Sequence, residues 1–313
     1  LAKFLTMVTP GKVRNLRTKK DYTGSTPITD ALKDPALRAG DEIVADTGCF
    51  YAEPTIDFKG KDILLRSGSL DGATVGDPSP DDTIIGWYDE EQALEGVAQV
   101  ANQPTVNFAT NETGAAVLRG FTIQDGSPGI RIGTVVIQNK QEVVKESSPR
   151  IENCIVRKNL VQGGVICTGG KAVITGCSIV DNQSAVQGGG LFARRGSQIV
   201  VTQSRVGRNL ALDGWGGGIC LDGGSAQVTW CRIFDNEARW QGGGVYLYDT
   251  NSPIVDCNIT GNYSSIDGGG VYYDQAGARI QVRNTVLTGN RAYYYGGAIG
   301  AALTSGQVQN CLF

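Results

Sequence analysis

The chain has 313 residues, of which 41% are hydrophobic, and a net charge of −3. This balance gives no electrostatic footprint for nucleic acid, and no run of 18 apolar residues is present to span a membrane. Histidine is absent, which excludes Ser-His-Asp triads, Cys-His pairs and histidine-ligated zinc.

The first predicted elements are an N-terminal strand and a capping helix within residues 1–42. Residues 26–33 favour a short helix, with Thr26 at the N-cap and Pro27 at the first helical position. The end coil of a solenoid exposes edge strands and core, so we place this helix over that end.

Residues 43–133 are predicted to form irregular early coils. Residues 43–46 and 63–66 are β-branched and apolar, as strands are, whereas residues 71–102 look like a long acidic loop. The polar residues 134–150 are predicted to form an insertion loop before the regular repeats begin.

Regular repeats occupy residues 151–313. An asparagine position recurs in steps of 23, 27, 27, 26 and 28 residues, and a run of two or three glycines follows it. Five residues before each asparagine is a position for a small residue. The asparagine position holds Asn159, Asn182, Asn209, Asn236, Asn262 and Asn290, and the small position holds Cys154, Cys177, Ser204, Cys231, Cys257, Thr285 and Cys311. Upstream, residues 117–126 match one repeat, with Gly120 in the small position and Asp125 in the asparagine position.

The period decides the fold class. About 26 residues suits one turn of a three-sided parallel coil, whereas propeller blades need about 40 to 50. We therefore predict an all-β, right-handed, single-stranded parallel β-helix, with residues 1–313 as one domain. Stacked asparagines can hydrogen-bond along the axis and tolerate left-handed turns. The chain starts at Leu1 and ends at Phe313 within a repeat, so we expect a processed protein or part of a longer one, with the repeats continuing.

Two stretches resemble known families. Residues 28–67 are similar to the opening of secreted bacterial right-handed β-helix repeat proteins. The repeats resemble polymorphic outer-membrane protein adhesins, which carry GGA[IVL] and FxxN motifs: residues 296–299 read GGAI, and Ile233 stands three residues before Asn236 where that family has Phe. The resemblance covers about half of the chain. It implies a bacterial, extracellular or cell-surface location.

The repeated cysteines suggest either a disulfide chain or a core column. Neighbouring coils place Cα atoms ~4.8 Å apart, but parallel stacking leaves the Cβ atoms equally far apart, beyond the usual range of about 3.5–4.5 Å. We therefore expect reduced thiols buried in the core, including the off-column Cys49, Cys167 and Cys220.

A catalytic alternative rests on charged residues beside the asparagines. Polysaccharide lyases of this fold bind calcium with clustered carboxylates and use Arg or Lys as base, and related hydrolases use paired Asp groups. Asp181, Arg208 and Asp235 would stack in successive coils. A charge-balanced solvated surface is the competing interpretation. We expect no cofactor, with calcium required only by this enzyme alternative.

Aromatic residues precede several glycine runs. Trp215, Trp240, Tyr294 and Tyr295 occupy turns, where exposed rings could stack on sugars or contact a protein. Packing over glycine backbone is the alternative. The strand tyrosines Tyr246, Tyr248, Tyr272 and Tyr273 are expected to form a stacked column.

Three functions stay open. The favoured one is an extracellular structural or binding rod in a surface layer, filament or adhesin, contacting glycans. The second is a polysaccharide lyase or hydrolase. The third is an architectural subunit that binds a protein partner or itself through the open C-terminal coil end.

Overall fold

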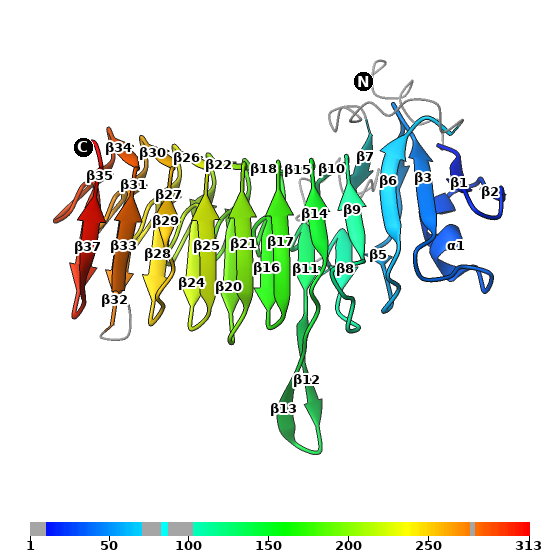
Figure 1. Ribbon diagram of the computed structural model, residues 1–313, viewed down its shortest axis with the longest axis horizontal. Helices are drawn as coiled ribbons and strands as arrows, with labels where there is room; N and C mark the ends of the chain where they lie inside the picture. Colours follow the sequence, from blue (N-terminus) through cyan, green and yellow to red (C-terminus); the bar gives the residue numbers. More distant parts are fainter. Residues whose placement is uncertain (1–10, 71–82, 87–102, 276–278) are drawn as a thin grey trace, which may run out of the picture.

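The computed structural model describes residues 11–70, 83–86, 103–275 and 279–313. Figure 1 shows a rod of stacked coils that runs from helix α1 (Pro27–Lys33) at one end to strand β37 (Ser305–Gln309) at the other. The coils align their strands into long parallel sheets along the rod. The β-helix predicted from the repeat period is confirmed.

Three long sheets form the sides of the rod, and a short corner sheet lies between the second and the third. Sheet A contains β2 (Asp21–Tyr22), β1 (Val13–Asn15), β3 (Glu42–Asp46), β6 (Leu64–Gly68), β9 (Val117–Arg119), β14 (Arg150–Glu152), β17 (Lys171–Thr175), β21 (Gln198–Thr202), β25 (Ser225–Thr229), β29 (Ile254–Val255), β33 (Arg279–Arg283) and β37. Sheet B contains β4 (Phe50–Ala52), β7 (Ile84–Gly86), β10 (Thr122–Ile123), β15 (Ile155–Arg157), β18 (Ser178–Val180), β22 (Arg205–Gly207), β26 (Arg232–Phe234), β30 (Asn258–Thr260) and β34 (Val286–Thr288). Sheet C contains β5 (Ile56–Asp57), β8 (Val106–Phe108), β11 (Ile130–Ile132), β16 (Val165–Thr168), β20 (Leu191–Arg194), β24 (Ile219–Asp222), β28 (Val245–Tyr248), β32 (Val271–Asp274) and β36 (Ile299–Ala302). The corner sheet contains β19 (Gln183–Ser184), β23 (Leu210–Ala211), β27 (Glu237–Ala238), β31 (Tyr263–Ser264) and β35 (Arg291–Ala292).

The core is a set of in-register apolar columns. On sheet B, Val156, Ile179, Val206 and Ile233 pair coil to coil, and all four are buried. Their strand neighbours point outward because successive side chains of a strand alternate between its faces. The outward side chains of successive coils therefore also line up in register, in columns on the outer surface of each sheet.

The N-terminal end is covered by helix α1, which packs on β1, β2 and β5. Thr26 occupies the N-cap position and Pro27 begins the helix, as predicted, but the Thr26 side chain makes no capping hydrogen bond. Instead, the buried Glu53 carboxylate accepts hydrogen bonds from the backbone N–H groups of Ile28 and Thr29, both at 2.7 Å. Glu53, and not Thr26, thus accepts the hydrogen bonds of the free N–H groups at the start of the helix.

Two expected loops differ from the structure. Strand β7 lies within the predicted acidic loop, of which residues 71–82 and 87–102 are outside the described part. The insertion at 134–150 folds mainly as an antiparallel hairpin, β12 (Thr134–Gln138) and β13 (Gln141–Lys145), which projects away from the stack in Figure 1. Asn139 and Lys140 turn it with φ of 51° and 64°, as the commonest two-residue hairpin turn requires.

The alignment of the repeat at 117–126 was wrong by one residue. Thr122 pairs with Ile155, which places Phe121, and not Gly120, beside Cys154. Gly126, and not Asp125, stands in the asparagine position, and its N–H donates to Asn159 Oδ1 at 2.9 Å. Asp125 has a φ of 62°, so it occupies the left-handed position that precedes each asparagine.

Candidate functional site

The asparagines form a continuous hydrogen-bonded ladder that joins neighbouring coils at the turn between sheet B and the corner sheet. From Asn159 to Asn262, each Nδ2 donates to Oδ1 of the asparagine in the next coil at 2.9–3.0 Å. The preceding residue, and not the asparagine itself, takes the left-handed conformation. The last glycine of each triplet packs against an asparagine of the ladder and leaves no room for a side chain. A Cβ on Gly190, for example, would lie 2.8 Å from Asn209 Nδ2.

The column of small residues lies inside the coil. Cys154, Cys177, Cys231 and Cys257 are buried, whereas Cys311 is half-buried, and all eight cysteines of the chain are free thiols. Cys220 differs, because it is buried on the outer side of sheet C, where burial raises the pKa of its thiol. The described residues contain no group of three or more Cys, Asp or Glu side chains placed to hold a metal ion.

The three charged candidates for catalysis occupy the left-handed position before successive asparagines. Asp181, Arg208 and Asp235 have φ of 57°, 52° and 52°. Arg208 donates through Nε and Nη2 to the two carboxylate oxygens of Asp181, both at 2.7 Å. These hydrogen bonds raise the pKa of Arg208. An exposed arginine held by a carboxylate is a poor base, so this geometry favours a charge-balanced surface.

Aromatic rings gather over the outer side of sheet C. Tyr246 and Tyr272 pair in register, and their rings stack 6.0 Å apart at 3°. Trp215 stacks on Tyr246 at 5.6 Å, and Trp240 packs edge-on against Trp215 at 4.6 Å. We call these four residues, together with the adjoining Tyr248, the aromatic face.

The two tryptophans are less exposed than their turn positions predict. Both are half-buried, because they fold back over sheet C, and Trp215 Nε1 donates to Gln241 Oε1 at 2.8 Å. Tyr273 also differs from the expected column: it points into the core and is fully buried. Trp215 thus packs on Tyr246 and Trp240 on Trp215, and each tryptophan keeps part of its surface exposed.

Tyr293, Tyr294 and Tyr295 form a separate exposed turn. Their exposed fractions are 69%, 62% and 77%, and the rings of Tyr293 and Tyr294 meet edge-on at 4.8 Å. The backbone N–H of Tyr295 donates to Asp267 Oδ1 at 3.0 Å. One intervening coil separates this turn from Trp240, so the predicted binding residues fall into two groups.

Polar groups border the aromatic face. The Tyr246 hydroxyl donates to Asp274 Oδ2 at 2.9 Å, and burial raises the pKa of Tyr246, which keeps it a neutral donor. Asp222, Tyr248 and Asp274 stack in register along its edge. This arrangement offers apolar rings beside hydrogen-bond acceptors.

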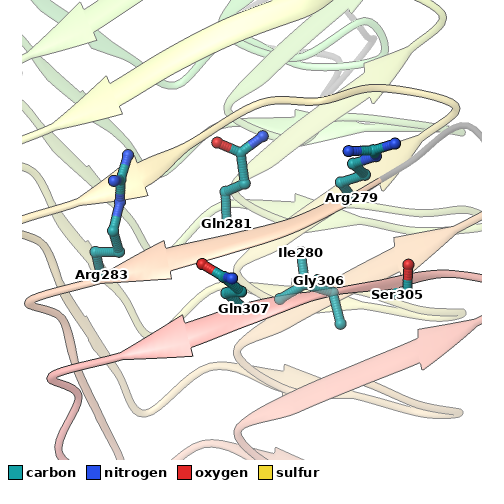
Figure 2. Close-up of a pocket in the computed structure, with 7 residues that line it drawn as sticks. All are labelled: Arg279, Ile280, Gln281, Arg283, Ser305, Gly306 and Gln307. Atoms are coloured by element: carbon teal, nitrogen blue, oxygen red, sulfur yellow. The ribbon is translucent and has the colours of Figure 1, made fainter.

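A hollow lies at the C-terminal end of sheet A, away from the aromatic face. It has a volume of about 580 Å³ and is lined by Arg279, Ile280, Gln281, Arg283, Ser305, Gly306 and Gln307. Figure 2 shows Arg279, Gln281 and Arg283 extending to the same side of β33. Among the described residues, neither a carboxylate nor a predicted site residue lines this hollow.

Comparison with known proteins gives one match. A family model described as the right handed beta helix region matches residues 135–313. No curated protein and no solved structure matches significantly. Within the described residues, no helix has the length and apolar character needed to cross a membrane.

Proposed function

Because the chain belongs to the right-handed β-helix family, we propose that it is a rigid rod that binds glycans through the aromatic face. The observation that carries this proposal is the set of rings held in register on the outside of sheet C. Rings that are already fixed by packing lose little conformational entropy when a sugar stacks on them.

The borders of the aromatic face favour a neutral glycan. Asp222 and Asp274 can accept hydrogen bonds from sugar hydroxyls, whereas they would repel a carboxylate or sulfate. Gln241 adds an amide beside Trp215. Apolar rings with a few placed polar groups are typical of ligand sites.

We place this rod outside the cell or on its surface, in a surface layer, filament or adhesin. A stack of parallel coils gives a long, uniform side on which repeated contacts can form. A lyase or hydrolase would need carboxylates free to act, and the Asp181 carboxylate is engaged by Arg208. We therefore do not advance the enzyme alternative.

The test is a binding screen with neutral polysaccharides, followed by titration with the oligosaccharide that binds, using tryptophan fluorescence and calorimetry. We expect Trp240→Ala to weaken binding at least about tenfold, as removal of a central aromatic contact usually does. Trp230→Ala is the matched control, because Trp230 is 66% exposed on a turn between sheets A and B. Equal losses in both variants, or no binding by the native protein, would refute the proposal.

A further inference from the structure

A second cluster lies on the outer side of sheet B, away from the aromatic face. Phe234 follows the inward Ile233 on β26 and points outward, yet it is only 4% exposed. Its ring lies over Gly207 of the previous coil, where a Cβ would be 2.3 Å from the ring. Three guanidinium groups cover it: Arg205, Arg208 and Arg232 lie 5.4, 5.6 and 4.7 Å from its centroid.

Two of these arginines are adjacent and carry like charge. Arg205 and Arg232 pair in register on neighbouring strands, which places their backbones ~4.8 Å apart. Asp181 engages Arg208, whereas neither Arg205 nor Arg232 has an ion pair or hydrogen bond to a carboxylate among the described residues. Like charges directly opposite on a sheet are destabilising.

The Phe234 ring explains part of how this pair is tolerated. Cation–π contacts hold each guanidinium over the ring and contribute roughly 0.5–1 kcal/mol at exposed sites. They also bring both guanidinium groups to one ring, and both arginines are exposed. A guanidinium fork matches an oxyanion with two oxygens.

We propose that Arg205 and Arg232, seated on Phe234, form an oxyanion-binding site. Its ligand is a carboxylate, sulfate or phosphate group, either as a free anion or as a substituent of an acidic glycan. The bound group accepts hydrogen bonds from both guanidiniums and removes their repulsion. This proposal does not rest on the neutral-glycan site, because the two clusters lie on different sheets.

The first experiment is thermal unfolding in sodium sulfate, sodium phosphate and sodium chloride at equal ionic strength. Binding to the native state raises the unfolding temperature, and sulfate and phosphate also stabilise proteins in general because they are excluded from the protein surface. We therefore expect sulfate or phosphate, relative to chloride, to stabilise the native protein more than it stabilises Arg232→Gln. Calorimetry with a uronate oligosaccharide and with a sulfated oligosaccharide then distinguishes the two sources. An oligosaccharide that binds at least tenfold more tightly than the free anion assigns the site to an acidic glycan, and equal affinities assign it to the free anion.

Variants make the test specific. We expect Arg205→Gln and Arg232→Gln each to weaken oxyanion binding at least tenfold, and Arg232→Lys to weaken it several-fold because the fork and the stacking are lost. Arg239→Gln is the control. Arg239 is exposed, and its Nε forms a long ion pair of 3.7 Å with Asp213 Oδ1. The variant removes the same charge and should change affinity less than twofold.

The outcomes are distinguishable from misfolding. In chloride, Arg205→Gln and Arg232→Gln should unfold close to the native temperature, because each removes a repulsion together with a cation–π contact. If Arg239→Gln weakens binding as much as Arg232→Gln does, the effect is one of net charge and the proposal is wrong. A native protein that sulfate, phosphate and both oligosaccharides leave unchanged would also overturn it.

Discussion

Substitution of Asn209 by alanine tests the ladder at its centre. Asn209 Oδ1 accepts hydrogen bonds from the backbone N–H and the Nδ2 of Asn182, both at 3.0 Å. Its Nδ2 donates to the Ile179 carbonyl at 2.9 Å and to Asn236 Oδ1 at 3.0 Å. Asn209 is 1% exposed, so water cannot replace these partners without opening the coil.

The expected cost follows from these four bonds. Each contributes about 1 kcal/mol net, and a buried N–H left without an acceptor costs about 1–3 kcal/mol. We therefore expect Asn209→Ala to lower the free energy of unfolding by about 4 kcal/mol. Asn290, half-buried at the last rung, has three such side-chain bonds, so its alanine variant should lose about 2 kcal/mol.

Equilibrium unfolding in urea, followed by tryptophan fluorescence, measures both values. Gln227→Ala, on sheet A of the next coil, is the control. Gln227 is exposed on β25, and we expect its loss to change the free energy by less than about 0.5 kcal/mol. If Asn209→Ala costs no more than Gln227→Ala, the ladder does not hold the coils together and our account of the repeat is wrong.

Three further predictions concern packing, acid and thiols. Gly207→Ala should cost about 1–3 kcal/mol by overpacking the Phe234 ring, and an equal cost in a Phe234→Ala background would contradict this cause. Asp41 is buried, and hydrogen bonds from Arg17, Asn15 and the Arg38 backbone hold the pKa of its carboxyl well below the usual range. A lowered folded-state pKa contributes stability above the unfolded pKa of about 3.9, and this stability is lost as pH falls below that value. The protection of N-terminal cap amides from hydrogen exchange, taken relative to the intrinsic exchange rate at each pH, should therefore fall between about pH 5 and 3 more in the native protein than in Asp41→Asn. With a thiol reagent, we expect eight reactive cysteines in denaturant and rapid reaction of Cys49 and Cys311 alone in the native state, because the other six are buried; fast labelling of a third thiol would argue against the buried column.

Most of the fold could be predicted from the repeat period of the sequence. Asparagine spacing predicted parallel coils because backbone pairing forces equivalent residues into columns. The error at Gly120 arose because the coil before the regular repeats has Phe121 in the small position, so residue size misled the alignment. The hairpin at 134–145 was missed because its polar composition was given more weight than its paired valines and the Asn139-Lys140 turn.

The candidate sites were harder to predict, since they depend on how outer side chains meet across coils. The sequence indicated Trp215 and Trp240, but not that Trp215 stacks on Tyr246 and Trp240 packs against Trp215. Arg205 and Arg232 are 27 residues apart, and no local motif links them. The cluster on Phe234 follows only once the register is known.

The ladder also penalises coils that stack out of register. The repeats differ in length by several residues, and the turns absorb these differences while the asparagines stay aligned. A coil docked one residue out of phase would turn its apolar side chains outward and leave an amide facing a partner that cannot pair with it. Each coil therefore constrains the register of its neighbour. A rod could gain or lose whole coils in this way without disturbing the order of its outer columns.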